Sequence, residues 1–521
     1  MDQAALFFLA VAALVFAVPL ANRIGVPYPV LLTLVGIGAA LLPGFPEITI
    51  DPDVILPALL PPLLYAAAQR TSWAQVRAQW RPILTLAVAL VVVSAFAAAA
   101  LITVLLPGVP WAIAIAVGAA AAPPDPVAAT AVASRIGLPH RILAVIEGEG
   151  LVNDATALTL YHVGVAAFAA GGAITWYGVG GEFLWSTVGG LAVGAGVAWL
   201  ATKILGWLTD PILQGAFTVS LPYAAYLAAE AVGASGVLAV LVAGLGIRRV
   251  AFDVFDPESR LAGRAFWETV DLLLTAVAFV LVGLELRPIL RDTGMDLARQ
   301  LLIAGTVATL LVVLRMVWLV LGGLLRRERS RRASGRPLRV PADWREGVVV
   351  GWAGMRGVVT VAAALALPAD APHRSTLLLI AFVTVAVTLL IPGLTLAPLA
   401  RALGVSGVDR DAAVRDVAAR VISAVMVRID ELYTDGVLDD GGARTWRARC
   451  NALLVALSPG AAQQPELASG HAASRGRRAV NVELLAAAQQ EALRLRLDHL
   501  VDPSAVDQVL RDLDRRLLQL R

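Results

Sequence analysis

The sequence predicts an all-α membrane protein that crosses the bilayer many times, with interrupted helices in its core and a helical cytoplasmic tail. Of its 521 residues 58% are hydrophobic and 16% are charged, and the mean hydropathy is +0.76, well above the values of soluble domains. Apolar stretches of membrane-spanning length recur about thirteen times before residue 404. Prolines and glycines interrupt two of these stretches, which predicts broken helices.

The apolar stretches approach the roughly 20 residues that a helix needs to cross the bilayer core, so each is predicted to be one transmembrane helix surrounded by lipid. The first stretch lacks a basic leader and a small-residue cleavage pattern, which favours a membrane span over a removed signal peptide. The single cysteine, Cys450, excludes an intramolecular disulfide and a cysteine-based metal site. The predicted spans are residues 4–21, 28–43, 53–68, 82–106, 110–134, 142–170, 183–206, 213–231, 234–250, 268–287, 300–325, 346–367 and 374–402.

Basic residues are concentrated in the linkers on one side of the predicted membrane. The positive-inside rule assigns these linkers to the cytoplasm, so we expect the N-terminus outside the cell and the C-terminal tail inside. An odd number of helices agrees with this orientation in the cell membrane. The basic residues on this side are Arg23, Arg70, Arg77, Arg81, Arg135, Arg141, Lys203, Arg248, Arg249, Arg260, Arg264 and the run from Arg326 to Arg345.

From residue 404 onward the composition changes from apolar to charged and amphipathic, as in residues 409–432 and 480–521. A segment rich in glycine, proline and serine lies between residues 458 and 476. The sequence therefore predicts two domains, a transmembrane domain at residues 1–403 and a cytoplasmic helical tail at residues 404–521. The tail is either an appendage that aids folding or dimer contact or a regulatory sensor, and its ligand is unknown.

Ionisable residues inside a span are costly, so they are the first candidates for function. Asp125 lies inside the fifth span, in the sequence Ala-Ala-Pro-Pro-Asp-Pro-Val of residues 121–127. Prolines remove backbone donors and clash with the preceding turn, so no continuous helix can pass this point. Broken helices in membranes line cavities and use their freed ends to hold ions. Asp125 is predicted to bind the ion, to cap the second half-helix, or to do both.

Glu149, Gly150, Asn153 and Asp154 lie early in the sixth span. At helical spacing Glu149 and Asn153 share one face, whereas Gly150 and Asp154 share another. A carboxyl group held away from water resists ionisation, so we expect Asp154 to bind and release a proton near physiological pH. A nearby cation favours the ionised form, and competition between the two ions, combined with alternating access, produces exchange. Glu149 points elsewhere and is expected to have a structural role.

Arg356 lies in the twelfth span among glycines, in the sequence Gly-Trp-Ala-Gly-Met-Arg-Gly-Val of residues 351–358. An unpaired arginine at this depth would be costly, so Arg356 is predicted to form a salt bridge with Glu149. The flanking glycines predict a second interrupted helix, which corresponds to the break at Asp125. Two interrupted segments in corresponding halves indicate an inverted-repeat transporter whose site lies where they cross.

Four other ionisable residues are weaker candidates. His162 lies eight residues after Asp154 and is interpreted either as a proton relay or pH sensor or as a packed side chain. Glu230 lines the cavity or lies at a helix end, whereas Asp271 and Glu285 flank the tenth span and are expected at the membrane interface. The sequence contains no P-loop, no His-Glu-x-x-His motif and no Gly-x-Ser-x-Gly motif, which argues against an enzyme. We expect no cofactor and no nucleic-acid partner.

Residues 148–155, Gly-Glu-Gly-Leu-Val-Asn-Asp-Ala, resemble the Gly-Glu-Ser-x-x-Asn-Asp-Ala signature of the monovalent cation/proton antiporter family, which includes bacterial sodium/proton antiporters and animal sodium/proton exchangers. The resemblance covers about residues 5–403. Supporting matches occur in the family's order at residues 61–65, 125–127, 279–286 and 354–357.

The resemblance implies a homodimer in which each protomer has a dimerisation domain and a core domain. It implies that Asp154 carries the transported ion, that Asp125 is a second residue of the alkali-cation site, and that Glu149 and Arg356 form a structural ion pair. An asparagine rather than a second acid at position 153 is typical of members that exchange one cation for one proton without net charge movement. Asn153 is therefore included in the predicted ion and proton site.

Three departures from the family pattern affect ion selectivity. Gly150 stands where relatives have a serine, Pro124 where many have a threonine, and Ala66 where some have a glutamate. Each departure removes a side-chain oxygen, and Gly150 is expected to leave room beside Asp154 for water or a less dehydrated ion. Hard oxygen ligands accept any alkali cation, so we expect transport of Na⁺, with K⁺ and Li⁺ as alternatives.

The sequence is also compatible with a second class of function, a channel or a sensor. An ion channel, or a transporter-derived sensor regulated through the cytoplasmic tail, would also retain buried charges and broken helices. Saturable flux that depends on the counter-ion would exclude a channel. An intramembrane hydrolase would need a paired catalytic constellation, and the sequence offers none.

Overall fold

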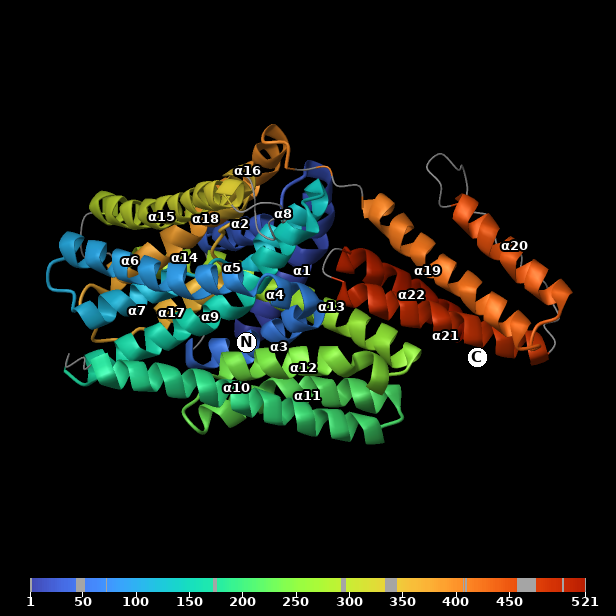
Figure 1. Ribbon diagram of the computed structural model, residues 1–521. Helices are drawn as coiled ribbons and strands as arrows, with labels where there is room; N and C mark the ends of the chain where they lie inside the picture. Colours follow the sequence, from blue (N-terminus) through green and yellow to red (C-terminus); the bar gives the residue numbers. More distant parts are fainter. Residues whose placement is uncertain are drawn as a thin grey trace. The chain divides into compact units, whose positions relative to one another are not determined.

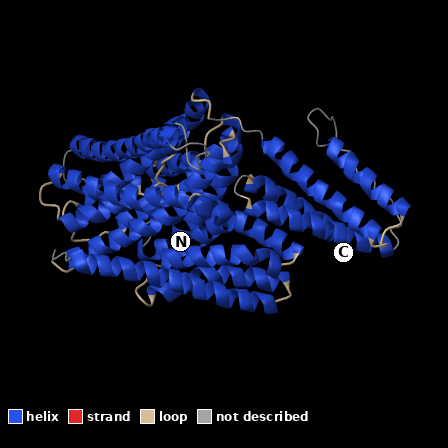
Figure 2. Cartoon of the chain, in the orientation of Figure 1, coloured by secondary structure: helices blue, strands red, loops and turns tan. Residues whose placement is uncertain are grey.

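The computed structural model describes residues 2–43, 52–71, 73–171, 176–291, 297–332, 344–405, 407, 410–456, 475–498 and 501–520, and every regular element in these ranges is helical (Figures 1 and 2). The predicted all-α class is therefore confirmed. The chain divides into two compact units, one formed by Met1–Val254 with Gly263–Gly407 and the other by Phe255–Ala262 with Val408–Arg521.

The first unit contains most of the helices that Figure 1 labels. These are α1 (Asp2–Ile24), α2 (Tyr28–Leu41), α3 (Pro52–Arg70), α4 (Trp73–Ala78), α5 (Trp80–Leu84), the π-helix η1 (Thr85–Leu90), α6 (Val91–Leu105), α7 (Trp111–Ala121), α8 (Pro126–Ile136), α9 (His140–Ala169), α10 (Trp176–Trp207), α11 (Pro211–Glu230), α12 (Gly236–Val254), most of α13 (Pro257–Leu284), α14 (Leu286–Arg291), α15 (Leu297–Arg332), α16 (Trp344–Trp352), α17 (Val358–Leu365) and α18 (Arg374–Ala402).

Each predicted span falls on one of these helices or on consecutive ones. Among the described residues, seven helical stretches are long and apolar enough to cross a membrane by themselves, and the apolar helices Phe8–Ile24 and Tyr28–Leu41 are shorter. The expected number of crossings, about thirteen, stays a prediction. The seven long stretches are Trp80–Leu105, Trp111–Ala133, Gly180–Trp207, Pro211–Glu230, Pro257–Ile289, Leu297–Gly322 and Arg374–Ala402.

Two spans are interrupted where the sequence predicts it. The fifth span breaks between α7 and α8, because consecutive prolines at Pro123 and Pro124 supply no backbone donors. The twelfth span breaks between α16 and α17, around the glycines on either side of Arg356. Both interruptions are thus confirmed.

Close approach of backbones holds α13 against α2. A Cβ atom at Gly36 would lie 3.0 Å from the Cα of Gly283, and a Cβ atom at Gly283 would lie 2.6 Å from the backbone nitrogen of Ile37. Small residues at helix contacts let two backbones approach in membranes, where dispersion rather than water exclusion drives packing. This contact fixes α13, which carries side chains of the cavity described below.

The second unit contains α19 (Arg410–Thr434), α20 (Asp440–Ala456), α21 (Arg475–Leu497) and α22 (Pro503–Leu520), together with the first turn of α13. Its core includes Ile429, Leu432 and Cys450, all buried. Arg260 from the first turn of α13 donates from Nε to the buried Asp514 of α22 at 3.0 Å. Membership of residues 255–262 in this unit was not predicted, since the sequence places them in a linker between spans.

Candidate ion-binding site

The two interrupted helices meet at their breaks. The backbone N–H of Asp125 donates to the carbonyl oxygen of Met355 at 2.6 Å. A Cβ atom at Gly357 would overlap the Asp125 carboxylate and lie 2.5 Å from its Cγ, far inside van der Waals contact. The missing side chain at Gly357 therefore makes room for the Asp125 carboxylate, and the predicted crossing of two broken helices is confirmed.

Asp125 is also the N-cap of α8. Its Oδ1 accepts a hydrogen bond from the backbone N–H of Val127 at 2.8 Å, and Pro126 occupies the first helical position, where its fixed φ fits and its missing donor costs nothing. The predicted capping role is confirmed. The role in ion binding stays a prediction.

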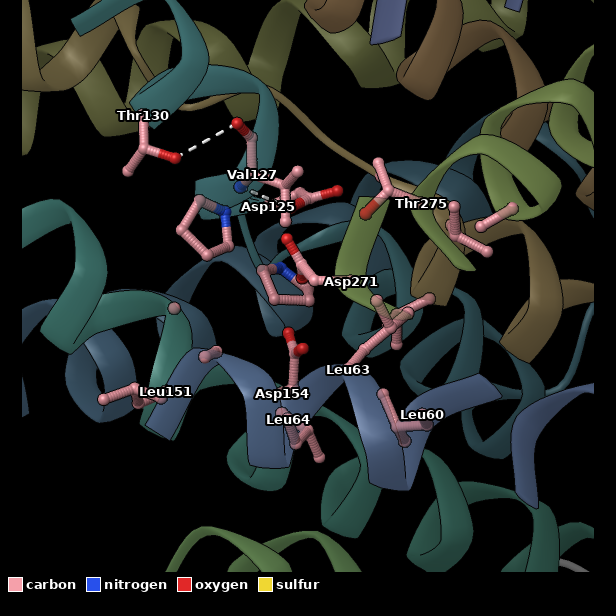
Figure 3. Close-up of a pocket in the computed structure, with 18 of the residues that line it drawn as sticks. Leu60, Leu63, Leu64, Asp125, Val127, Thr130, Leu151, Asp154, Asp271 and Thr275 are labelled. Carbon is pink, nitrogen blue, oxygen red and sulfur yellow. Dashed lines mark hydrogen bonds between the residues drawn. The ribbon is translucent and has the colours of Figure 1, made fainter. Parts of the chain in front are cut away.

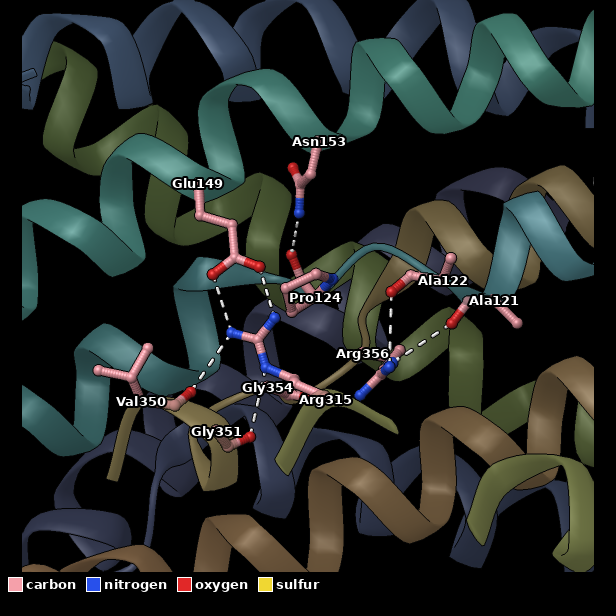
Figure 4. Close-up of polar contacts among 10 residues, drawn as sticks. All are labelled: Ala121, Ala122, Pro124, Glu149, Asn153, Arg315, Val350, Gly351, Gly354 and Arg356. Atoms are coloured by element: carbon pink, nitrogen blue, oxygen red, sulfur yellow. Dashed lines mark hydrogen bonds and ion pairs between the residues drawn. The ribbon is translucent and has the colours of Figure 1, made fainter. Parts of the chain in front are cut away.

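Arg356 stabilises the other side of the break. Its guanidinium is buried and donates from Nε to the Ala121 carbonyl at 3.3 Å and from Nη2 to the Ala122 carbonyl at 3.4 Å (Figure 4). Carbonyls at a helix C-terminus lack intrahelical partners and carry a partial negative charge. Arg356 therefore caps the end of α7, where the prolines leave those carbonyls unsatisfied.

The predicted salt bridge between Glu149 and Arg356 is wrong, because the partner of Glu149 is Arg315 of α15. Arg315 binds Glu149 with both guanidinium nitrogens, Nη1 to Oε1 and Nη2 to Oε2, the latter at 2.8 Å (Figure 4). Both side chains are almost completely buried, at 4% and 1% exposure. Arg315 also donates to the carbonyls of Val350 and Gly351, so it ties α9 and α15 to the end of α16.

The sequence did carry a signal for Arg315. It is an isolated basic residue in the apolar eleventh span, and such a charge needs a partner as much as Arg356 does. Gly354 provides the space, because a Cβ atom there would lie 2.5 Å from the Arg315 Cδ.

Asn153 connects α9 to the break in the fifth span. Its Nδ2 donates to the carbonyl oxygen of Pro124 at 2.7 Å, and the side chain is fully buried (Figure 4). Its Oδ1 has no hydrogen-bond partner within the described part of the chain. Pro124 therefore contributes a backbone oxygen that is directed at Asn153.

A cavity of about 120 Å³ lies beside the crossing, which is room for several water molecules. Asp125, Asp154 and Asp271 line it and project toward the same space (Figure 3). Asp154 interacts electrostatically with Asp125, and Asp125 with Asp271. No hydrogen bond or ion pair holds the Asp154 carboxylate among the residues that the structure describes, so this group is available to an ion or a proton.

Gly150 has a different role from the predicted one. A Cβ atom at this position would lie 2.6 Å from Cδ of the Pro126 ring. The ring thus fills the space where a serine side chain would stand. The prediction that Gly150 leaves room for water or an ion is therefore wrong, although Gly150 itself is part of the cavity wall.

Asp271 lines the cavity, which the sequence analysis did not predict. It is buried at 7% exposure, and its predicted place at the membrane interface stays a prediction. Arg70, the last residue of α3, binds it with two nitrogens, Nη1 to Oδ2 and Nη2 to Oδ1, the latter at 3.2 Å. The helix that carries Asp271, α13, begins at Pro257, eleven residues before the predicted start of the tenth span.

The cavity wall also contains threonine hydroxyl groups that the sequence analysis missed. Thr130 of α8 and Thr275 of α13 line the cavity (Figure 3). Thr130 Oγ1 donates to the Val127 carbonyl at 3.1 Å, and Thr275 Oγ1 is buried without a partner among the described residues. Position gives a weak signal, since Thr275 follows Asp271 by one helical turn.

The other three weaker candidates lie outside the cavity. His162 is exposed on α9 beside the Tyr161 ring, with the ring centroids 5.6 Å apart. Glu230 is exposed as the last residue of α11, which agrees with the helix-end alternative. Glu285 is buried at the junction of α13 and α14. None of these three residues lines the cavity.

The family described as "Sodium/hydrogen exchanger, transmembrane" matches residues 9–402. The chain belongs to this sodium/hydrogen exchanger family. An uncharacterized Na⁺/H⁺ exchanger of Mycobacterium tuberculosis is 32% identical to this exchanger over 400 residues, which cover 75% of the chain and 73% of the relative. The Na⁺/H⁺ antiporter ApNhaP of Aphanothece halophytica is 28% identical over 391 residues, with 73% and 70% covered.

The exchanger also shares its fold with a solved structure. The sodium proton antiporter MjNhaP1 from Methanocaldococcus jannaschii superimposes with a TM-score of 0.59 over 77% of this chain and 99% of MjNhaP1, at 19% identity. The family confirms the predicted resemblance and the predicted exchange of a monovalent cation for protons. The exchanger is a multi-pass membrane transporter and not an enzyme, and the channel or sensor alternative is not favoured.

Proposed function

We propose that the exchanger moves Na⁺ and H⁺ in opposite directions by competition at Asp154, with Asp125 as the second carboxylate of the site. The observation that supports this most is the contrast between two acids about one and a half turns apart on α9. Glu149 is held by Arg315, whereas Asp154 faces the cavity with no hydrogen bond or ion pair among the described residues. Only a carboxylate without a fixed partner can exchange a proton for a cation.

The surroundings of Asp154 favour an ion that keeps part of its hydration shell. The cavity holds several waters, and Thr130 and Thr275 place hydroxyl oxygens in its wall. Alkali cations take hard oxygen ligands from carboxylates, hydroxyls and water. We therefore propose Na⁺ as the main transported ion, in line with the names of the relatives, and K⁺ and Li⁺ as further substrates. One relative, from Bacillus pumilus, is described as a sodium, potassium, lithium and rubidium/H⁺ antiporter.

Exchange without net charge movement follows from the same site. One proton leaves Asp154 when one monovalent cation arrives, and the neighbouring Asn153 carries no charge. Asn153 acts here as a positioning residue, since it holds the Pro124 carbonyl and with it the break that presents Asp125. Alternating access would come from movement of the crossed helices relative to the rest of the transmembrane domain.

We propose that the exchanger lies in the cell membrane as a homodimer, with the N-terminus outside and residues 404–521 in the cytoplasm, where their ligand is unknown. Large apolar side chains such as Phe16, Trp199 and Ile212 are exposed, which suits contact with lipid.

Asp154→Asn tests the proposed function. Full-length protein is reconstituted into proteoliposomes with an imposed pH gradient, and the collapse of the gradient is followed after addition of Na⁺, K⁺ or Li⁺. We expect wild type to collapse the gradient with Na⁺ and Asp154→Asn to be inactive with every ion. Asp210→Asn is the matched control, because Asp210 is exposed, caps α11, and asparagine caps a helix equally well. Full activity of Asp154→Asn would contradict the proposal.

A further inference from the structure

The cavity contains an ion pair that the exchange at Asp154 does not by itself require. Its charged lining residues are Arg70, Asp125, Glu147, Asp154 and Asp271. The lining thus has four acids and one basic residue, Arg70, which donates two hydrogen bonds to Asp271. A bidentate arginine holds a carboxylate more firmly than a single contact does.

The two members of the pair differ in exposure. The Arg70 side chain is 43% exposed, whereas that of Asp271 is 10% exposed. Glu147 acts electrostatically on Arg70, and Asp271 acts on Asp125. Glu147 and Asp154 are seven residues apart on one face of α9, or about 10 Å along the helix. Because Arg70 and Asp154 line the same cavity, a cation held there lies within range of the charge on the guanidinium.

We propose that Arg70 is an internal counter-ion of Asp271, which competes electrostatically with the arriving cation and so sets its apparent affinity. The inference rests on the proposed function and adds a pair of positioning residues to it. While Arg70 neutralises Asp271, the cavity attracts cations less than its four acids would. The pair prevents the cation from binding so tightly that it cannot leave.

The proposal predicts opposite effects for the two partners. Arg70→Gln leaves Asp271 negative and removes a positive charge, so the KM for Na⁺ should fall by about tenfold, the size expected for one charge at this range and intermediate dielectric. Asp271→Asn releases the guanidinium toward Asp125 and Asp154, so the KM should rise by a similar factor. The double variant restores the net charge of the cavity, and its KM should return to near the wild-type value.

The experiment measures the KM for Na⁺ in proteoliposomes at one fixed pH and ionic strength, for wild type, both single variants, the double variant and Arg70→Lys. KM does not depend on the amount of folded protein, so poor expression of a variant leaves the comparison valid. Arg141→Gln and Glu346→Gln are matched controls, since Arg141 and Glu346 form an ion pair of almost the same exposure outside the cavity lining. Both controls should keep the wild-type KM, and Arg70→Lys should stay close to it.

Opposite shifts of KM that cancel in the double variant support the proposal. Shifts of the same sign in the two single variants, unchanged KM in both, or equal shifts in the control pair would each overturn it, because a purely structural ion pair gives these results. A wild-type protein without Na⁺-dependent proton flux would instead contradict the proposed function, so the two failures are distinguishable.

Discussion

At the scale of single residues, Glu149 and Asp154 of α9 differ because their neighbours differ. Helical spacing places Glu149 and Asp154 on different faces of α9, and this separation could be predicted from the sequence. The partner of Glu149 could not, because pairing depends on which helix lies opposite, and Arg315 is 166 positions away on α15. The role of Gly150 was also beyond prediction, since only the fold brings the Pro126 ring against it.

Gly357→Ala is predicted to abolish exchange. The added methyl group overlaps the Asp125 carboxylate, so either Asp125 or the break in the twelfth span must move, at a cost of about 1–3 kcal/mol in stability. The measurements are Na⁺-dependent proton flux and thermal melting in detergent. Gly305→Ala is the matched control, because nothing lies within 4 Å of a Cβ atom at that position of α15. Wild-type flux in Gly357→Ala would contradict the described contact.

At the scale of elements, the breaks in the fifth and twelfth spans were predictable because proline and glycine act locally. The sequence could not reveal how the broken ends are satisfied. Arg356 caps the carbonyl end of α7, and Asp125 caps the amide end of α8. The positive side chain thus meets the partly negative helix end, and the negative side chain meets the partly positive one. The π-helix η1 between α5 and α6 also left no signal in the apolar sequence around it.

A double-mutant cycle separates the true partner of Glu149 from the predicted one. Removing either member of a buried ion pair leaves an uncompensated charge, whereas removing both does not. We therefore expect Glu149→Gln and Arg315→Gln to be coupled by about 1–3 kcal/mol in stability. Glu149→Gln and Arg356→Gln should be coupled more weakly. Thermal melting of the purified variants in detergent gives both values, and stronger coupling to Arg356 would contradict the pairing.

At the scale of the whole molecule, the apolar spans and the change of composition after residue 403 made a membrane part and a charged helical tail predictable. That residues 255–262 belong to the second unit was not predictable, because Arg260 looks like any other basic linker residue. In the structure its guanidinium is paired with Asp514, and Gln489 also donates to Asp514 at 2.8 Å. One helix, α13, thus contributes to the tail unit at its start and to the cavity further along.

Asp514→Asn is predicted to loosen the second unit. The substitution leaves Arg260 without its buried partner, which costs about 3–5 kcal/mol. Limited proteolysis of the full-length protein should therefore cut within residues 408–521 faster than in wild type. Asp512→Asn is the matched control on the same helix, because its pair with Arg515 is exposed and worth little. Equal cleavage rates for Asp514→Asn and wild type would show that the pair does not stabilise this unit.

The central claim is that a proton and a cation compete for Asp154, and the dependence of Na⁺ affinity on pH tests it most directly. Initial rates of exchange are measured in proteoliposomes over a series of Na⁺ concentrations at several pH values. Protonation removes the charge that binds Na⁺, so the account predicts that KM for Na⁺ rises as the pH falls while the maximal rate at saturating Na⁺ stays constant. A KM independent of pH, with only the maximal rate changing, would contradict it.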